Sequence, residues 1–288
     1  MRLHCYNVQA QSSHGELAVT APLRFVLVEK KDCIAKVTLN RPERLNALAP
    51  EVADDLVSAI TDVSKDDSVG VVIFTGAGRA FCSGGDIKTL AGGEEKSAYS
   101  SEAIEEIRRG FEPAQAVILG IQRMEKPTIA MVNGAATGAG MDIAFACDMR
   151  IGGPATRFAS SYIKIGLFPG WGGTWLLPRV IGLAKAAEMV MTGDAIEAEE
   201  ALRIGALNKL VPAEQLETAV MELAKRLAAG PPIALRLAKL NLYKGLEIDL
   251  ETAMKFAAAS ETITLSSQDH REGAQAFREK RSPKYTGR

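Results

Sequence analysis

Two apolar runs typical of buried strands are each followed by a glycine-rich turn, and this repeat constrains the fold more than any other feature. The first run covers residues 71–75 (VVIFT), and the turn behind it reads AFCSGGDIK over residues 80–88. The second run covers residues 127–132 (PTIAMV), and its turn reads NGAATGAGMD over residues 133–142. Short continuous apolar runs are typical of strands that are buried on both faces of a sheet. The sequence therefore predicts an α/β fold in which strand, turn and helix recur.

The remainder of the chain divides into a mixed part and a helical part. Residues 25–28 and 34–39 are rich in β-forming side chains and predict an antiparallel hairpin, whereas residues 50–63 have the apolar spacing of a helix. From Pro212 onward the pattern is helical, with no strand signal. We expect three segments along the chain: a flexible leader over 1–22, an α/β core over 23–211 and a helical region over 212–288.

Composition argues against several classes of partner. The chain of 288 residues carries a formal net charge of −1 at pH 7, so it has no overall attraction for nucleic acid or for an anionic membrane. Residues 1–22 contain neither an apolar stretch long enough for a signal peptide or membrane span nor the repeated arginines of a mitochondrial presequence. We therefore expect a cytoplasmic protein with no nucleic-acid partner and no membrane partner.

The cysteines give no sign of a metal site. Cys5, Cys33, Cys82 and Cys147 are widely spaced, and no histidine stands at a metal-ligand spacing from them, so we expect no metal, no disulfide framework and reduced thiols. Cys82 lies inside the first turn, where it could be argued as a nucleophile. No histidine is near a motif that would place a base beside it, which favours a buried structural role for Cys82.

Residues 72–78 resemble the opening of a dinucleotide-binding turn. The third glycine of that motif would fall on Phe81, and the residues that follow form another glycine-rich turn instead of a helix. We therefore do not expect a Rossmann domain.

The two glycine-rich turns also suggest a chemistry. Two backbone turns of this kind can direct two N–H groups at one carbonyl oxygen, and stabilising the oxyanion that develops there is often the largest single contribution in acyl chemistry. The sequence therefore predicts an enzyme that polarises a thioester. The alternative is that both segments merely form tight turns.

Five segments stand in a specific order along the chain: LNRPERLNAL at 39–48, AFCSGGDIK at 80–88, VNGAATGAGMD at 132–142, GLFPGWGG at 166–173 and AFREKR at 276–281. In these segments the chain resembles the enoyl-CoA hydratase/isomerase family, also called the crotonase superfamily. The resemblance implies a right-handed spiral of ββα units followed by an α-helical trimerisation region. It also implies an acyl-CoA substrate, no cofactor beyond the coenzyme A of that substrate, and a homotrimer or a hexamer built from two trimers.

The resemblance assigns binding roles to particular residues. The two oxyanion-hole amides fall on Gly85 and Ala139, where a small residue lets the backbone approach the thioester closely. Contacts to coenzyme A are implied for residues of the first turn, for a preceding arginine and for the C-terminal helix: Arg44, Ser83, Asp86, Ile87, Lys88, Phe277 and Lys280. Lys and Arg suit phosphate because they supply positive charge and several donors, but each of these cations could equally be a solvated surface residue.

The sequence departs from the family's pattern at the catalytic carboxylates. The first of the two hydratase glutamates falls on Asp142, which retains an acid, whereas the second falls on Tyr162. Burial can tune a carboxyl with a reference pKa of about 4 toward neutrality, but a phenol with a pKa of about 10 is a poor base. We expect Asp142 to act as acid and base and Tyr162 as an orienting donor, which puts ordinary hydratase efficiency in doubt.

Other carboxylates could compensate for the missing glutamate. Four of them lie in the segment that covers the acyl pocket in relatives: Glu102, Glu105, Glu106 and Glu112. A charge run of this kind is usually a solvated face, which speaks against catalysis by any one of them. Relatives that use an acid eight residues after the second glutamate position find no counterpart here, because that position is Gly170. The adjacent Trp171 is expected to be a pocket wall or a core residue.

Three interpretations of the function follow. The first is an enoyl-CoA hydratase-like enzyme that works through an enolate held by Gly85 and Ala139. The second is another enolate reaction: double-bond isomerisation, ring opening, or decarboxylation of a malonyl-type CoA in which Tyr162 could hold a substrate carboxylate. The third is an oligomeric CoA-binding protein that kept the fold and lost activity, which the missing second glutamate favours and the retained Asp142 opposes.

Overall fold

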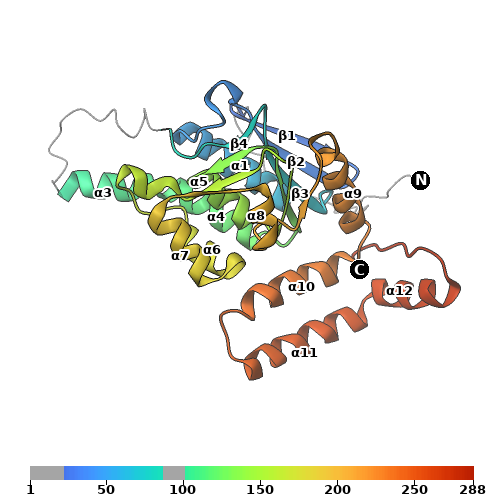
Figure 1. Ribbon diagram of the computed structural model, residues 1–288. Helices are drawn as coiled ribbons and strands as arrows, with labels where there is room; N and C mark the ends of the chain where they lie inside the picture. Colours follow the sequence, from blue (N-terminus) through green and yellow to red (C-terminus); the bar gives the residue numbers. More distant parts are fainter. Residues whose placement is uncertain (1–22, 87–100) are drawn as a thin grey trace, which may run out of the picture.

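The computed structural model describes residues 23–86 and 101–288, and two sheets form its centre (Figure 1). The predicted leader, Ile87 and Lys88 lie outside the described residues. The larger sheet contains β1 (Val26–Lys31), β2 (Ile34–Leu39), β3 (Val71–Gly76), β5 (Thr128–Val132), β7 (Met149–Gly152) and β10 (Lys209–Leu210), in the order β1-β2-β3-β5-β7-β10. The smaller sheet contains β4 (Ala80–Cys82), β6 (Ala135–Thr137), β8 (Arg157–Ala159) and β9 (Ala195–Glu197), in the order β4-β6-β8-β9.

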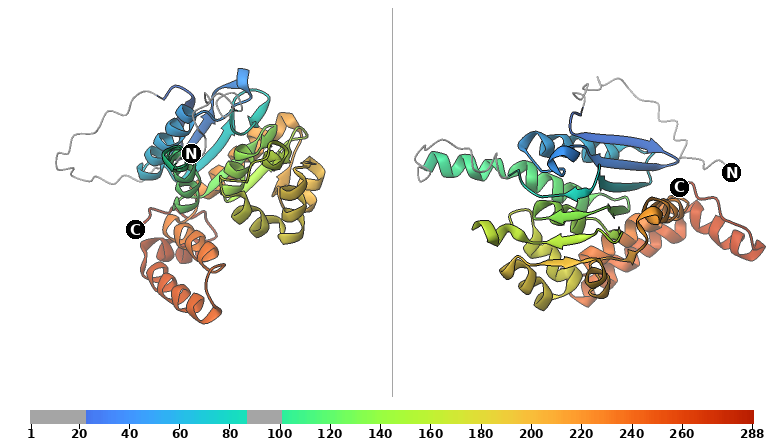
Figure 2. Two further views of the ribbon diagram at one scale, coloured as in Figure 1. Left: turned by 90° about the vertical axis from the view of Figure 1, so that its left-hand side faces the viewer. Right: turned by 45° about the horizontal axis from the view of Figure 1, so that its top comes forward.

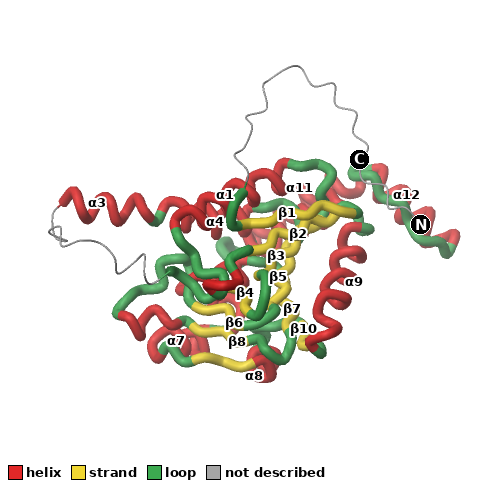
Figure 3. Tube along the Cα trace, turned by 90° about the horizontal axis from the view of Figure 1, so that it is seen from above, coloured by secondary structure: helices red, strands yellow, loops and turns green. Residues whose placement is uncertain are grey.

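From β3 to β8, successive strands alternate between the two sheets. β1 and β2 form the predicted antiparallel hairpin, and β2, β3, β5, β7 and β10 then run parallel. β4, β6 and β8 are also parallel to one another, with β9 antiparallel at the edge. The pairs β3 and β4, β5 and β6, and β7 and β8 thus each contribute one strand to each sheet (Figure 3). This repetition confirms the predicted α/β fold built from ββα units.

Helices surround the sheets and continue into a C-terminal extension. The α-helices are α1 (Pro50–Lys65), α3 (Ser101–Gly110), α4 (Glu112–Arg123), α5 (Ala139–Ala146), α6 (Gly173–Ile181), α7 (Leu183–Thr192), α8 (Ala198–Arg203), α9 (Leu216–Ala228), α10 (Pro232–Lys244), α11 (Leu250–Ser266) and α12 (Gln268–Glu279). The described residues also form the short 3₁₀ helices η1 (Pro42–Arg44), η2 (Ser161–Ile165) and η3 (Ala213–Gln215). No helix in the described part of the chain is both long enough and apolar enough to cross a membrane.

The larger sheet is covered on both faces, as its apolar strands predict. Because side chains alternate along a strand, Val71 and Ile73 of β3 pack in a cluster with α9, whereas Val72 and Phe74 pack in the main core with α1, α4 and α5. All six residues of β3 are buried. Helix α1 buries the positions that its spacing predicts: Val52, Leu56, Ile60 and Val63.

Helices α10 to α12 form an extension that stands away from the sheets (Figures 1 and 2). No residue of α11 is buried, although Leu250 and Met254 on it are large and apolar. Helix α9 belongs to the predicted helical region but packs against β2, β3, β5 and β7. The described residues after Pro212 form helices and no strand, and the helices that leave the core begin at Pro232.

Candidate active site

The two glycine-rich turns lie side by side because the strands that precede them are neighbours. β4 and β6 pair in parallel, so their carboxyl ends meet at one edge of the smaller sheet. Gly84 has a φ of 91°, and a Cβ atom there would lie 2.6 Å from the Thr137 carbonyl oxygen and 3.6 Å from the Ala139 nitrogen. Only glycine fits this conformation at this distance, and the first turn therefore reaches the start of α5.

Both expected oxyanion-hole amides are left without an acceptor by the local hydrogen bonding. Leu48 and Gly85 form a parallel bridge, in which the Leu48 N–H donates to the Gly84 oxygen at 2.8 Å and the Leu48 oxygen accepts from the Asp86 N–H at 2.9 Å. This pairing directs the N–H of Gly85 away from Leu48. Ala139 is the first residue of α5, where a backbone N–H has no partner within the helix. Neither amide donates to an acceptor in the described part of the chain.

Two asparagines hold the loop between β3 and β4, which leads into the first turn. Asn46 is 1% exposed and adopts a φ of 58°, and its Nδ2 donates to the carbonyl oxygens of Ala77 and Ala80, each at 2.9 Å. Asn133 of the second turn donates through Nδ2 to the Gly78 carbonyl oxygen at 2.8 Å. Both asparagines lie in the segments that carry the family resemblance, which is the sequence signal that could have found them.

Asp142 and Tyr162 are in direct contact. Asp142 lies in the first turn of α5 and is 0% exposed, and the Tyr162 hydroxyl, from η2, donates to its Oδ2 at 2.7 Å. The other oxygen, Oδ1, makes no hydrogen bond to the described part of the chain. A Cβ atom at Gly173 would lie 2.5 Å from Oδ1, so a glycine is needed there to leave room for the carboxyl group.

Burial dominates the acidity of both groups. It raises the pKa of Asp142 to about 7, against the hydrogen bond from Tyr162 and the nearby backbone amide of Gly173, which oppose the rise. Burial, followed by the charge of Asp142, also raises the pKa of the Tyr162 phenol above its ordinary value. Near neutral pH, Asp142 is therefore divided between its neutral and ionised forms, whereas Tyr162 remains a hydrogen-bond donor. A carboxyl group in this state can both accept and deliver a proton.

The structure brings only some of the expected coenzyme A contacts together. Arg44 is exposed at the end of η1, and the carbonyl oxygen of Arg44 lies 3.5 Å from the Ser83 hydroxyl. Asp86 lies 3.5 Å from the guanidinium group of Arg41, beside the same turn. Phe277 and Lys280 lie at the end of α12, away from the two turns (Figures 1 and 2). Within one chain those two residues do not reach the site, so their contact with a ligand there requires a second copy.

The other candidate acids lie on or near the projecting helix α3 (Figure 3). Glu105 forms ion pairs with Arg108 at 2.7 Å and Arg109 at 3.1 Å, and Glu112 at the start of α4 is exposed. These placements agree with a solvated face. The side chains of Glu102 and Glu106 lie outside the described part of the structure.

Gly170 lies against an aromatic ring. A Cβ atom there would lie 2.9 Å from the Phe111 ring, and Trp171 is partly buried against the main core. The position that is acidic in some relatives therefore faces an aromatic ring here.

The cysteines follow the expectation at two positions and depart from it at a third. Burial raises the pKa of the Cys82 thiol to about 12, and its Sγ donates to the Asn46 carbonyl oxygen at 3.0 Å, so it is an inert core residue. Cys147 is also free and buried. Cys33 is disulfide-bonded, so the expectation of reduced thiols is wrong for this residue. A disulfide depends on proximity in space, which sequence spacing does not show. No cluster of metal ligands occurs within residues 23–86 and 101–288.

Comparisons with known proteins agree with this architecture. A family model described as enoyl-CoA hydratase/isomerase matches residues 29–288. The short-chain-enoyl-CoA hydratase of Clostridium acetobutylicum is 35% identical over 260 residues, covering 90% of this chain and 96% of the relative. The 1,2-epoxyphenylacetyl-CoA isomerase of Escherichia coli is 33% identical over 266 residues, covering 92% and 100%. A crystal structure of a putative enoyl-CoA hydratase from Streptomyces coelicolor has a TM-score of 0.88 at 36% identity, covering 96% of this chain and 98% of that one.

Proposed function

The chain belongs to the enoyl-CoA hydratase/isomerase family and is a hydratase-like enzyme of it, and we propose that its reaction is the hydration of an enoyl-CoA through an enolate. The observation that carries this proposal is a pair of amides on two adjoining turns, Gly85 and Ala139, that donate to no acceptor among the residues the structure describes. Removing a single donor from an oxyanion hole reduces turnover by about 100-fold to 1,000-fold in other enzymes.

Asp142 supplies the proton chemistry in this proposal. Its ionised carboxylate takes a proton from water as the water oxygen bonds to Cβ, and the electrons of the double bond move onto the thioester oxygen held by the two amides. The carboxyl group then returns that proton to Cα, so H and OH have been added across the double bond. Tyr162 occupies Oδ2, which leaves Oδ1 as the oxygen that exchanges the proton. A pKa of about 7 suits both halves of this cycle.

The proposal includes the binding of coenzyme A and an oligomer. Arg44, Ser83 and Asp86 beside the first turn would contact the coenzyme A portion, together with Ile87 and Lys88. The large apolar side chains exposed on α10 and α11 support a homotrimer or a hexamer, in which Phe277 and Lys280 of one copy would reach the site of another. A cytoplasmic location also belongs to the proposal.

The test is the hydration of crotonyl-CoA and of longer or cyclic enoyl-CoAs by wild type and by Asp142→Ala. We expect measurable wild-type turnover and a loss of at least about 100-fold in kcat for the variant, because no other carboxylate in the described part of the chain contacts the Asp142 carboxyl group. Asp194→Ala is the matched control, since Asp194 is exposed and pairs with Lys164 on the surface. Equal turnover by wild type and Asp142→Ala would remove Asp142 from the mechanism.

A second reaction is favoured by one observation. Tyr162 stands where a second carboxylate is expected, and decarboxylation of a malonyl-type CoA needs less proton abstraction than hydration does. An isomerase is also among the similar proteins. Release of carbon dioxide from malonyl-CoA analogues, or migration of a double bond, without any hydration would favour this interpretation. Calorimetric binding of acyl-CoA with no turnover across the whole panel would instead indicate a CoA-binding protein without catalytic activity.

A further inference from the structure

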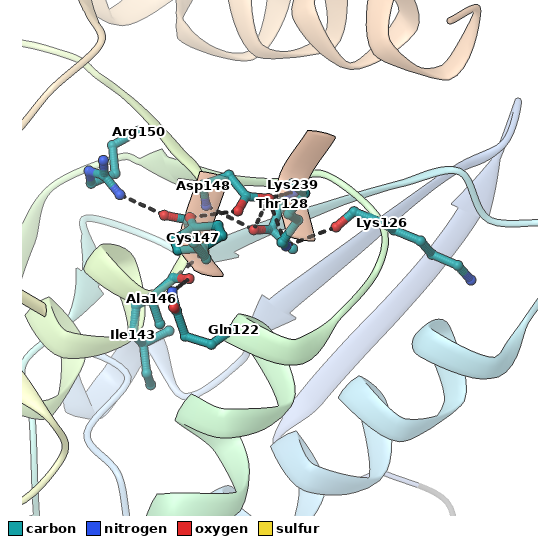
Figure 4. A network of polar contacts seen from close by, with 10 residues as sticks. Gln122, Lys126, Thr128, Ile143, Ala146, Cys147, Asp148, Arg150 and Lys239 are labelled. Carbon is teal, nitrogen blue, oxygen red and sulfur yellow. Dashed lines mark hydrogen bonds and ion pairs between the residues drawn. The ribbon is translucent and has the colours of Figure 1, made fainter. Parts of the chain in front are cut away.

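The C-terminal end of α5, opposite the Ala139 amide, is held by a buried polar network (Figure 4). Asp148 lies two residues beyond the end of α5, and its carboxylate accepts from the Thr128 backbone N–H at 2.7 Å and the Thr128 hydroxyl at 2.9 Å. It also forms an ion pair with Lys239 Nζ at 2.8 Å and accepts from the Tyr243 hydroxyl at 2.7 Å. Lys239 and Tyr243 belong to α10, so one carboxylate joins the catalytic helix to the C-terminal extension.

The extension meets the core here through polar contacts. Lys239 is the only buried residue of α10, and its Nζ also donates to the Lys126 carbonyl oxygen at 3.1 Å. Elsewhere α10 packs mainly against α11, and its Leu242 is 73% exposed. A cavity of about 740 Å³ separates α10 and α11 from α4 and α6, with Lys239 and Tyr243 on its wall. The bonds to Asp148 therefore connect α10 directly to the residues that follow α5.

Helix α5 is suited to transmit a displacement from one end to the other. All eight of its residues are buried, and at about 1.5 Å per residue it is roughly 12 Å long. Its last carbonyl groups are occupied, because Arg150 donates to the Cys147 oxygen at 2.7 Å and Gln122 donates to the Ala146 oxygen at 2.6 Å. A close-packed helix of this kind moves as a unit, and the Ala139 amide and Asp142 move with it.

We propose that Asp148, Lys239 and Tyr243 form a latch, which positions α5 and thereby sets the Ala139 amide and the Asp142 carboxyl relative to the first turn. The inference rests on the proposed function, because that function gives these two groups their catalytic roles. The three residues are positioning residues and do not touch the substrate. Buried ion pairs contribute little net stability, but they fix orientation through geometry, which is the property that the latch requires.

The test compares Lys239→Met and Tyr243→Phe with wild type. Methionine at position 239 keeps an unbranched side chain and removes the charge. Phenylalanine at position 243 removes only the hydroxyl group, so the ion pair between Lys239 and Asp148 is kept in this milder variant. The matched control is Lys244→Met on the same helix, because the Lys244 side chain is 53% exposed and its ion-pair partner among residues 23–86 and 101–288 is Glu247. Each protein is assayed for kcat and KM with crotonyl-CoA, for hydrogen exchange of the α5 amides, and for assembly by light scattering.

We expect Lys239→Met to lower kcat by about tenfold with KM within about twofold of wild type, and Tyr243→Phe to lower it less. Exchange of the α5 amides should be faster in both variants than in Lys244→Met. Equal kcat and equal exchange in Lys239→Met and Lys244→Met would overturn the latch, and so would a fall in kcat with unchanged α5 exchange. If wild type does not hydrate any enoyl-CoA, the proposed function fails, and the exchange comparison still decides whether α10 positions α5.

Discussion

At the scale of single residues, burial and hydrogen bonding act on Asp142 in opposite directions. Burial is the larger effect, and it places the pKa of the folded-state carboxyl at about 7, above its ordinary value of 3.8. Below pH 3.8 the group is protonated whether the chain is folded or unfolded. Between these two values the unfolded chain loses the proton and the folded chain keeps it, so stability falls as the pH rises through this window. Above pH 7 both states are ionised and the penalty is constant.

Replacing Asp142 with asparagine should remove this pH dependence. We expect the difference in the free energy of unfolding, Asp142→Asn minus wild type, to increase as the pH rises from 4 to 7. The increase should be on the order of 4 kcal/mol. Urea unfolding at a series of pH values measures both proteins, and the difference between them cancels the titration of every other group. A difference that does not change with pH would contradict a raised pKa for the buried Asp142 carboxyl group.

Tyr162→Phe tests the hydrogen bond to Asp142. Without the Tyr162 hydroxyl, the ionised carboxylate loses its charge-assisted bond, and the pKa of Asp142 should rise further. The acid limb of the pH profile of hydration should then move to higher pH, and the rate at pH 6 should fall by roughly tenfold. Tyr285→Phe, at a distant site in the C-terminal tail, is the control. An unchanged pH profile would show that Tyr162 does not set the acidity of Asp142.

At the scale of elements, the geometry of the site depends on one edge of the smaller sheet. β4 and β6 bring the two turns together, and the segment 45–48 pairs with residues 83–86 so that the Gly85 amide is left free. Asn46 is central to this arrangement, because its side-chain amide fills the space between the carbonyl groups of Ala77 and Ala80.

Asn46→Ala should affect turnover beyond its effect on stability. The buried carbonyl groups lose their donor, which should reduce the free energy of unfolding by about 1–3 kcal/mol. Displacement of the Gly85 amide should in addition lower kcat by about 100-fold. The control is Asn241→Ala, which removes a side-chain amide that bonds to Leu237 and Ser260 in the helical extension. If the two variants lose the same amount of kcat at matched stability, Asn46 does not position the Gly85 amide.

At the scale of the whole molecule, the extension exposes apolar surface that a single chain does not cover. Leu250 is 77% exposed and Met254 is 62% exposed on α11, a helix with no buried residue. Large exposed apolar patches on a protein usually mark an interface. The proposed contacts of Phe277 and Lys280 with coenzyme A would need a second copy as well, because both residues lie far from the turns in a single chain.

Leu250→Glu should therefore weaken the oligomer. A buried carboxylate without a partner opposes association, so we expect the variant to run at a smaller mass than wild type in light scattering. Leu27→Glu on the edge strand β1 introduces the same charge at an exposed leucine of the core and is the control. A wild-type protein that is a monomer at assay concentration would contradict the trimer and the hexamer together.

Local patterns in the sequence were sufficient for much of the fold. The apolar run of β3, the spacing of Val52, Leu56, Ile60 and Val63 in α1, and the hairpin of β1 and β2 all concern residues close together in the chain, where periodicity reports burial directly. The glycine-rich turns were also identified in this way. Their place beside each other follows from the rule that parallel strands end at one edge.

Tertiary structure alone decided the state of the site and its connection to the rest of the molecule. The sequence placed an aspartate and a tyrosine 20 residues apart, but only packing buries Asp142 completely and aims the Tyr162 hydroxyl at Oδ2. Asp148 and Lys239 are separated by 91 positions and carry no shared local signal. Acidity, hydrogen bonding and ion pairing depend on distances in space and on exclusion of water, and a linear chain acquires both only when it folds.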